Sequence, residues 1–369
     1  MKIKLFEMFA GYGGGSFALK KAGIQFECVG YSEIEKHAIK CYEQNHPNVK
    51  NYGDCKSINP DELPDFDLLM GGFPCQDVSI AGDRDLSKGR TNLFTEIIRI
   101  AKAKKPKYML LENVKGLLSS EKFKLNKSYF DRIKEELRKI GYGICHATLN
   151  SKDYGIPQNR ERVWIVCKYG GWDFMEFAFP EKKPLKITLK DILETNVNEK
   201  YNIREKALKL LKVHMGTSYA SKFNPDISNT LRTNYGNGYS NESYILQHSR
   251  SSDGKEIHYN VRNIAGTIKQ PSGNTQNLVL ALDLYNKKAH SDRTPALTEP
   301  HHNTLRLFDG MKIRKFTPKE CFKLMGFLND EINIEGISDS QLYSLAGNGW
   351  DINIVSLILK RLFYGNHIQ

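Results

Sequence analysis

The chain has 369 residues, of which 40% are hydrophobic and 26% are charged, and its formal net charge is +12. This length allows one or two domains, and the composition argues against a protein embedded in a membrane. The excess of Lys and Arg favours a polyanionic partner. Seven cysteines without a Cys-x-x-Cys pair argue against a disulfide framework and against a structural zinc site.

The first nine residues are not those of a signal peptide. Lys4 and Glu7 interrupt the apolar residues, and the segment leads directly into glycines. We therefore expect a cytoplasmic protein.

The first 170 residues alternate short apolar segments with segments of helical composition. Strands are predicted at Ile3–Phe9, Phe26–Tyr31, Asp67–Met70, Tyr108–Leu111 and Val163–Val166, and helices at Ser16–Lys21, Glu33–Asn45, Asn92–Lys104 and Tyr129–Ile140. This alternation predicts the α/β class, with a doubly wound, Rossmann-like parallel sheet. Ligands of such sheets bind beyond the carboxyl ends of the strands, so residues that directly follow a strand are the site candidates.

From about residue 181 to residue 312, short β-like pieces are separated by Gly, Asn, Ser and Thr. Lys and Arg outnumber Asp and Glu by 20 to 13 in this stretch. We predict a smaller, loop-rich, mostly β module that grips a polyanion. Thr317–Phe327 and Gln341–Phe363 return to helical composition and are expected to pack on the first domain.

A glycine-rich segment follows the first predicted strand. Residues 9–15 read Phe-Ala-Gly-Tyr-Gly-Gly-Gly, and glycines permit the tight turn and the close backbone approach that a nucleoside cofactor needs. Glu33 follows the second strand, where a carboxylate can accept hydrogen bonds from ribose hydroxyls. The pattern suits a dinucleotide or S-adenosylmethionine as cofactor. The alternative is an ordinary tight turn with an exposed Glu33 and no bound cofactor.

A cysteine and a glutamate follow the next two strands. Phe73 and Pro74 form a rigid, extended turn that holds Cys75 at the sheet edge. A lone cysteine is more commonly an inert core residue, but a Gly/Pro loop at a strand end favours a reactive thiol. Glu112 reaches the same edge, within reach of Cys75. A thiol and a carboxyl suit nucleophilic addition to an electron-poor ring whose nitrogen the acid protonates.

A cysteine protease would need a histidine at this edge. His37, His46 and His146 are the only histidines before the basic module, and none of them follows a predicted strand. The sequence therefore argues against a protease.

Residues 158–162 read Gln-Asn-Arg-Glu-Arg. Arg160 and Arg162 alternate along an extended segment, so both guanidinium groups project the same way and can hold a phosphate or a carbonyl oxygen. A solvated, salt-bridged edge is the other interpretation.

Taken in order, Phe-x-Gly-x-Gly-Gly, Pro-Cys-Gln, Glu-Asn-Val and Gln-x-Arg-x-Arg resemble the cytosine carbon-5 DNA methyltransferase family of the bacterial and phage restriction-modification type. The resemblance covers nearly the whole chain except most of residues 181–312. It implies a class I methyltransferase domain formed by residues 1–180 and 313–369, and a DNA target-recognition domain at residues 181–312. The implied reaction transfers a methyl group from S-adenosylmethionine to carbon 5 of a cytosine that is flipped out of duplex DNA.

The resemblance also implies a role for each matching residue. Cys75 would add to ring carbon 6, Glu112 would protonate ring nitrogen 3, and Arg162, supported by Arg160 and Gln158, would contact the cytosine carbonyl. The implied cofactor contacts are Phe9, Gly11, Tyr12, Gly13, Gly14, Glu33, Ile34, Asp54, Cys55, Pro74, Leu93 and Asn348.

Further positions concern DNA and the second module. Ser79 and Arg90 would face DNA, and Arg232 and Asn237 are candidates for reading its sequence, although Asn-Gly pairs are first of all turn formers. Arg314, Thr317 and Glu320 match a segment that supports the recognition domain. The chain departs from the family at Gly349-Trp350, where a small residue and Val are usual, which leaves open the shape of the cofactor pocket.

The implied partners are duplex DNA and a cognate restriction endonuclease, and we expect a monomer. A tRNA cytosine methyltransferase of the same superfamily would share Pro-Cys-Gln and Glu-Asn-Val. A non-catalytic DNA-binding protein on the same scaffold is a second alternative, against which the intact Cys75, Glu112 and Arg162 argue. A nicotinamide-dependent oxidoreductase would explain the glycine loop alone.

Overall fold

The computed structural model describes residues 2–73, 93–118, 128–171, 177–201, 316–328 and 331–365, together with short strands at 228–229, 243–248, 280–283 and 311–314. Several predicted site residues lie outside these ranges, namely Pro74, Cys75, Ser79, Arg90, Arg232 and Asn237.

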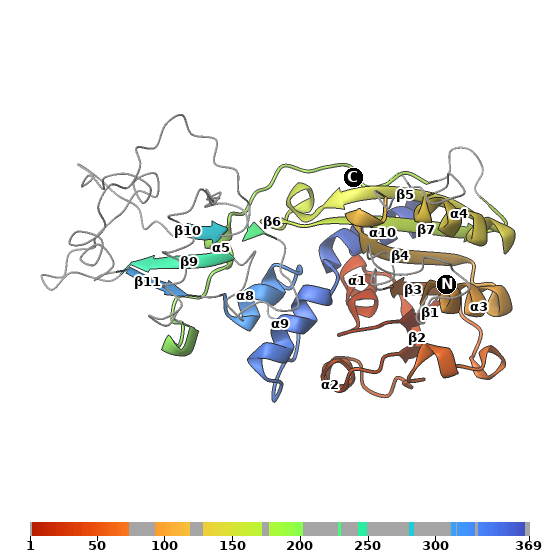
Figure 1. The fold of residues 1–369 in the computed structure, drawn as a ribbon, viewed down its shortest axis with the longest axis horizontal. Coiled ribbons are helices and arrows are strands. Elements are labelled where there is room, and N and C mark those ends of the chain that lie inside the picture. Colours follow the sequence, from red (N-terminus) through yellow and green to blue (C-terminus); the bar gives the residue numbers. More distant parts are fainter. Residues whose placement is uncertain are drawn as a thin grey trace, which may run out of the picture.

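A six-stranded mixed sheet forms the centre of the fold, in the order β2-β1-β3-β4-β7-β5 (Figure 1). The strands are β1 (Ile3–Met8), β2 (Phe26–Ser32), β3 (Leu68–Gly72), β4 (Tyr108–Val114), β5 (Tyr142–Asn150) and β7 (Glu161–Tyr169). Strands β2, β1, β3 and β4 run parallel to one another, as the alternation of strands and helices predicted.

The last predicted strand, Val163–Val166, runs in the opposite direction from the prediction. It lies within β7, which is antiparallel to both β4 and β5. The short connection from β5 to β7 contains only β6 (Gln158–Asn159) and the 3-10 helix η5 (Ser151–Tyr154). A parallel pair needs a crossover of a dozen or more residues, so this connection joins antiparallel neighbours. Strand β5 itself was not predicted, because a half-exposed edge strand lacks a continuous apolar run.

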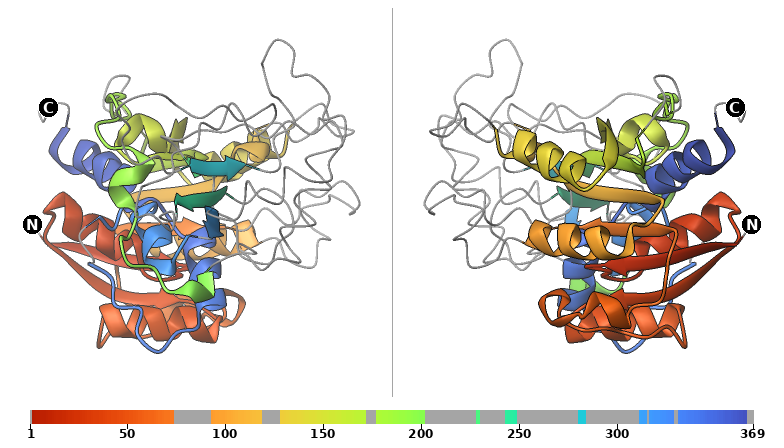
Figure 2. Two further views of the ribbon diagram at one scale, coloured as in Figure 1. Left: turned by 90° about the vertical axis from the view of Figure 1, so that its left-hand side faces the viewer. Right: turned by 90° about the vertical axis from the view of Figure 1, so that its right-hand side faces the viewer.

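Helices cover both faces of the sheet (Figure 2). On one face lie α1 (Gly14–Ala22) and α10 (Ile352–Tyr364), and on the other lie α3 (Leu93–Lys104) and α4 (Tyr129–Lys139). Helix α2 (Lys36–Asn45) follows β2. The predictions of these four N-terminal helices are confirmed, and only their ends differ.

The strand residues divide between two hydrophobic cores. Leu5 and Leu110 belong to the core under α1 and α10, while their chain neighbours Phe6 and Leu111 belong to the core under α3 and α4. Successive strand residues point to opposite faces of a sheet, so a strand that is covered on both faces reads as a continuous apolar run.

The C-terminal residues return to the N-terminal domain, as predicted. Helices α8 (Pro318–Lys323), α9 (Asp339–Asn348) and α10 contribute Phe322, Leu345 and Ile358 to the same core as Phe17 of α1. The chain thus closes its central domain with segments that lie more than 300 residues apart.

The remaining described elements are short. They are α5 (Leu189–Ile192), β8 (Ser228–Asn229), β9 (Ser243–His248), β10 (Leu280–Asp283), β11 (Met311–Arg314) and the 3-10 helices η1 (Cys55–Ser57), η2 (Pro60–Glu62), η4 (Lys115–Leu117) and η6 (Glu199–Tyr201). Strands β10, β9 and β11 form a three-stranded antiparallel sheet beside the main sheet (Figure 1). None of the described helices is both long enough and apolar enough to cross a membrane.

Candidate active site

The loop after β1 adopts backbone conformations that favour glycine. Gly11 and Gly13 have φ angles of +57° and +85°, and Gly13 caps the start of α1. The backbone N–H of Gly11 donates to Glu33 Oε2 over 2.9 Å, so the two predicted parts of the cofactor site touch. A side-chain carbon on Gly11 would meet no atom within 4 Å, which means that this part of the loop borders open space.

A buried carboxylate anchors the start of α1. Glu7 Oε1 accepts hydrogen bonds from the backbone N–H groups of Gly15 and Ser16, over 2.9 and 3.2 Å. Its Oε2 accepts from the hydroxyls of Ser16 and Tyr42, over 2.6 and 2.8 Å. Burial raises the pKa of Glu7, and these hydrogen bonds oppose that rise. Sequence reasoning missed this role, although an acidic residue inside an apolar strand was a signal.

The predicted cofactor contacts near the glycine loop differ in exposure. Ile34 is 63% exposed, an unusual position for a large apolar side chain. Phe9 is half-buried with a left-handed φ of +54°. Tyr12 and Gly14 are buried, and the Tyr12 hydroxyl donates to the backbone carbonyl of Trp350. An exposed apolar side chain beside an open backbone suits the flat face of a bound base.

The remaining described contacts lie at other strand and helix ends. Asp54 is exposed, and its Oδ1 accepts from the backbone N–H of Lys56 over 3.0 Å. Cys55 is buried in the core, where burial raises the pKa of its thiol to about 11. Leu93 begins α3 and is half-buried, and Asn348 ends α9 and is exposed. Cys55 can thus offer a cofactor its backbone, but its thiol belongs to the core.

Glu112 lies near the end of β4, opposite Gly72 of β3 and Trp164 of β7. Its side chain forms an ion pair with Arg162, whose Nε is 2.8 Å from Glu112 Oε1. Burial raises the pKa of Glu112, while the positive charges of Arg162 and Arg160 lower it. Burial is the largest of these effects, so the carboxyl group is able to hold a proton at higher pH than an exposed one.

The two arginines of the Gln-x-Arg-x-Arg segment meet this carboxyl group from β7 and from the residue that precedes it. Arg160 and Arg162 line one small pocket together with Glu112. Arg160 is only 2% exposed, and its Nη2 donates to the backbone carbonyls of Gly347 and Gly349, over 3.1 and 2.7 Å. The burial of Arg160 and the ion pair of Arg162 with Glu112 argue against the other interpretation, in which this segment is a solvated, salt-bridged edge.

Asn113 connects β4 to the chain that leads to Cys75. Its buried Nδ2 donates to the carbonyl of Phe73 over 2.9 Å, and its Oδ1 accepts from the backbone N–H of Val114. Phe73 stands two residues before Cys75, which lies outside the described residues. The side chain of Asn113 therefore fixes the start of the loop that carries the predicted nucleophile.

Gln158 is fully buried in β6. Its side-chain amide has no hydrogen-bond partner in the described part of the chain. A buried amide without a partner is costly and commonly serves a bound group or a neighbouring segment.

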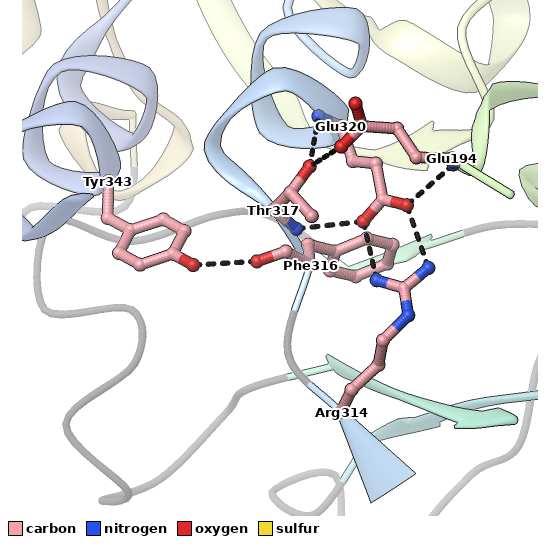
Figure 3. A network of polar contacts seen from close by, with 6 residues as sticks. All are labelled: Glu194, Arg314, Phe316, Thr317, Glu320 and Tyr343. Carbon is pink, nitrogen blue, oxygen red and sulfur yellow. Dashed lines mark hydrogen bonds and ion pairs between the residues drawn. The ribbon is translucent and has the colours of Figure 1, made fainter. Parts of the chain in front are cut away.

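The segment around Arg314 forms a buried polar network (Figure 3). Arg314 makes an ion pair with Glu320, which also accepts from the backbone N–H of Glu194 over 2.8 Å. Thr317 caps α8 and donates to the Glu194 carboxylate. Nearby, the Tyr343 hydroxyl donates to the carbonyl of Phe316 over 2.7 Å. The network joins α8 and α9 to residue 194, at the start of the predicted recognition domain.

Comparison with known proteins identifies the family. Residues 3–364 match the family described as C-5 cytosine-specific DNA methylase. The chain is 30% identical to the orphan methyltransferase M.SPRI of Bacillus phage SPR and 31% identical to the type II methyltransferase M.Bsp6I of Bacillus sp. strain RFL6, and each match covers 98% of both chains.

Solved structures share the fold. A DNMT2 variant from Spodoptera frugiperda has a TM-score of 0.69 at 22% identity and covers 98% of this chain and 100% of its own. The Entamoeba histolytica methyltransferase EhMeth has a TM-score of 0.66 at 18% identity, with 99% and 98% covered. The family match over residues 3–364 leads to one conclusion: the chain belongs to the C-5 cytosine-specific DNA methylases.

Proposed function

We propose that this protein is a sequence-specific DNA (cytosine-5-)-methyltransferase that uses S-adenosylmethionine. The observation that carries the proposal is the pairing of buried Glu112 with Arg162 at 2.8 Å. Asn113, directly beside Glu112, binds the carbonyl of Phe73 and so directs the chain toward Cys75. An acid and a cation thus meet at the carboxyl edge of the sheet, where ligands of α/β folds bind, and Phe73, two residues before Cys75, is anchored beside them.

The glycine loop and its surroundings fit S-adenosylmethionine. Open space beside Gly11, the Glu33 carboxylate and the exposed Ile34 offer a loop, an acceptor for ribose hydroxyls and an apolar surface for adenine. Asp54, Leu93 and Asn348 lie at the surrounding element ends. When bound, this cofactor supplies a methyl group on a positively charged sulfur.

The residues of the chain make carbon 5 of cytosine reactive. The Cys75 thiolate adds to carbon 6 while Glu112 delivers a proton to ring nitrogen 3, and the resulting electron density at carbon 5 allows it to take the methyl group, which leaves S-adenosylhomocysteine as the second product. Arg162 holds the cytosine carbonyl, and Arg160 and Gln158 support that position. Loss of the carbon-5 proton to water or hydroxide, with expulsion of Cys75, regenerates the free thiolate, and ring nitrogen 3 returns its proton to Glu112.

The target cytosine must leave the duplex to meet these groups, at a cost of a few kcal/mol. We propose that the basic residues 181–312 form the target-recognition domain that offsets this cost, with Arg232 and Asn237 as reading candidates and with Ser79 and Arg90 facing DNA. Type II relatives suggest a cognate restriction endonuclease with the same target site. We further propose a cytoplasmic monomer in a prokaryotic cell, encoded by the cell or by a phage.

Methyl transfer is the first test. The protein is incubated with methyl-labelled S-adenosylmethionine and either mixed-sequence duplex DNA or tRNA, and the nucleosides are then analysed and mapped. Labelled 5-methylcytosine in one short DNA context supports both reaction and specificity. Methylation of adenine or of the exocyclic cytosine nitrogen contradicts the mechanism, and transfer to tRNA alone contradicts the substrate.

The covalent step has its own test. Cytosine with fluorine at carbon 5 has no proton to lose there, so the adduct with Cys75 should persist and survive denaturing electrophoresis. Cys75→Ser should lose both the adduct and methyl transfer. A Cys75→Ser variant that methylates DNA as fast as the parent would rule out this nucleophile.

A further inference from the structure

Trp350 lies between the cofactor loop and the carboxyl group of Glu112. Its Cβ packs near Gly14, where a side-chain carbon would come within 3.3 Å of it. Its backbone carbonyl accepts the Tyr12 hydroxyl, and its ring meets Trp164 edge to face, with centroids 5.3 Å apart. These contacts fix both the backbone and the plane of the indole.

The far end of the same indole reaches Glu112. A side-chain carbon on Gly72 would lie 2.7 Å from Trp350 Nε1 and 3.1 Å from Glu112 Oε2, so both polar atoms crowd the same glycine. Trp350, Glu112 and Arg162 line one cavity. The indole N–H approaches the Glu112 carboxyl as a donor, while Arg162 Nε holds the other carboxyl oxygen at 2.8 Å.

The two contacts to the Glu112 carboxyl group come from different parts of the fold. Arg162 comes from β7, whereas Trp350 lies between α9 and α10, close to Gly349, whose carbonyl accepts from Arg160. A carboxyl group held on both oxygens has one orientation, and orientation decides whether a proton reaches its target atom. The small residue and Val that the family commonly has at positions 349 and 350 offer no side-chain N–H.

We propose that Trp350 is a positioning residue that orients Glu112 toward the target cytosine and joins that acid to the cofactor loop. The inference rests on the proposed function. The fold accommodates a residue as large as Trp at position 350 because Gly14 and Gly72 have no side chains, and Trp350 occupies the space beside them.

The test is the pH dependence of single-turnover methylation at saturating DNA and S-adenosylmethionine. Trp350→Phe keeps an aromatic ring and removes the N–H. The rate at the optimum should fall on the order of tenfold, because a hydrogen bond to an ionisable group is lost. The N–H favours the carboxylate form, so its loss raises the pKa of Glu112 and moves the descending limb of the profile to higher pH.

Tyr142→Phe is the matched control. It also keeps an aromatic ring and removes a buried donor, the hydroxyl that binds the carbonyl of Pro106 over 2.8 Å. Tyr142 pairs with Tyr169 at the opposite end of β7 from Arg162, so this variant should leave the pH profile unchanged. Gly72→Ala is a second variant that leaves Trp350 intact but places a carbon 2.7 Å from its Nε1. It should displace the indole and shift the limb in the same direction as Trp350→Phe.

Three results would overturn the proposal. Trp350→Phe could keep the parent rate and profile, it could lose only affinity for S-adenosylmethionine with an unmoved limb, or Tyr142→Phe could shift the limb as much. A parent protein that forms no 5-methylcytosine would instead refute the proposed function, so the two failures are distinguishable.

Discussion

The guanidinium of Arg314 meets the carboxylate of Glu320 in two parallel hydrogen bonds, each 2.8 Å long. Arg314 is 2% exposed and Glu320 is fully buried. Removing two charges from water is costly, and the pairing offsets that cost. Loss of one partner should therefore harm the fold far more than loss of both.

Glu320→Ala should lower the free energy of unfolding by about 3–5 kcal/mol, because it removes the carboxylate that binds the buried Arg314 guanidinium through two hydrogen bonds. The double variant Arg314→Met with Glu320→Gln removes both charges but keeps an oxygen that can accept from the backbone N–H of Glu194, and it should recover most of this loss. Urea unfolding of both variants and the parent measures the difference. A single variant within about 1 kcal/mol of the parent would show that the pair is not desolvated as described.

Glu7→Ala should destabilise the protein by about 2–4 kcal/mol, since two backbone N–H groups and two hydroxyls lose a buried acceptor. The start of α1 loses its anchor, so affinity for S-adenosylmethionine should fall as well. Glu7→Gln, which keeps one carbonyl acceptor, is the milder control. Calorimetric titration and denaturant unfolding separate the two effects, and unchanged binding by a folded Glu7→Ala would contradict the anchoring role.

His46 should make the fold sensitive to acid. Burial lowers its pKa from 6.5 to about 4 in the folded protein. The unfolded chain therefore takes up the proton first, and this contribution to stability is complete above about pH 6.5 and is lost as the pH falls toward 4. Between pH 7 and pH 5 the loss is about 2 kcal/mol.

His46→Phe keeps an aromatic ring beside Phe17, which lies 4.6 Å away between centroids. Its unfolding free energy should decline by about 2 kcal/mol less than that of the parent over the same interval. Urea unfolding at pH 7 and pH 5 measures this, and equal declines would place the titrating group elsewhere.

Asn113→Ala should slow methyl transfer at least tenfold, because the carbonyl of Phe73 loses the donor that directs the loop toward Cys75. The stability loss should be about 1–3 kcal/mol, as expected for an unsatisfied buried group. Asn59→Ala, which removes an exposed side chain that caps η2, is the control. Parent-like turnover in Asn113→Ala would refute this positioning role.

Local patterns in the sequence predicted much of the fold. The apolar runs of β1, β3 and β4 are buried on both faces, and the glycines after β1 predict the turn into α1. The direction of β7 could not be predicted in the same way, because period and composition are identical in parallel and antiparallel strands. Only the length of the connection that precedes β7 indicates its direction. That length is known only if β5 is recognised as a strand, and the half-exposed residues of β5 give no clear strand pattern.

In the candidate site, too, some features follow from local sequence patterns and others depend on the packed structure. Glu33 directly follows β2 and Glu112 lies near the end of β4, so the parallel strands place both at the carboxyl edge. Arg162, near the start of β7, reaches that edge only because β7 is antiparallel to β4. Glu7, Asn113 and Trp350 act through partners that are distant in sequence, such as Tyr42, Phe73 and Glu112. Sequence patterns indicate which residues are unusual, but these pairings depend on the packed structure.

The contacts of Arg160 also set an order of events during synthesis. Its carbonyl partners, Gly347 and Gly349, lie 187 and 189 residues further along the chain. At roughly 5–20 residues per second, a ribosome needs about 10–40 s to produce them after Arg160 has emerged. A nascent chain can fold the early strands in that interval, yet it lacks Trp350 and helix α10. Methylation competence therefore arrives only after these residues have been made, and chains that terminate before Gly347 should leave DNA unmarked.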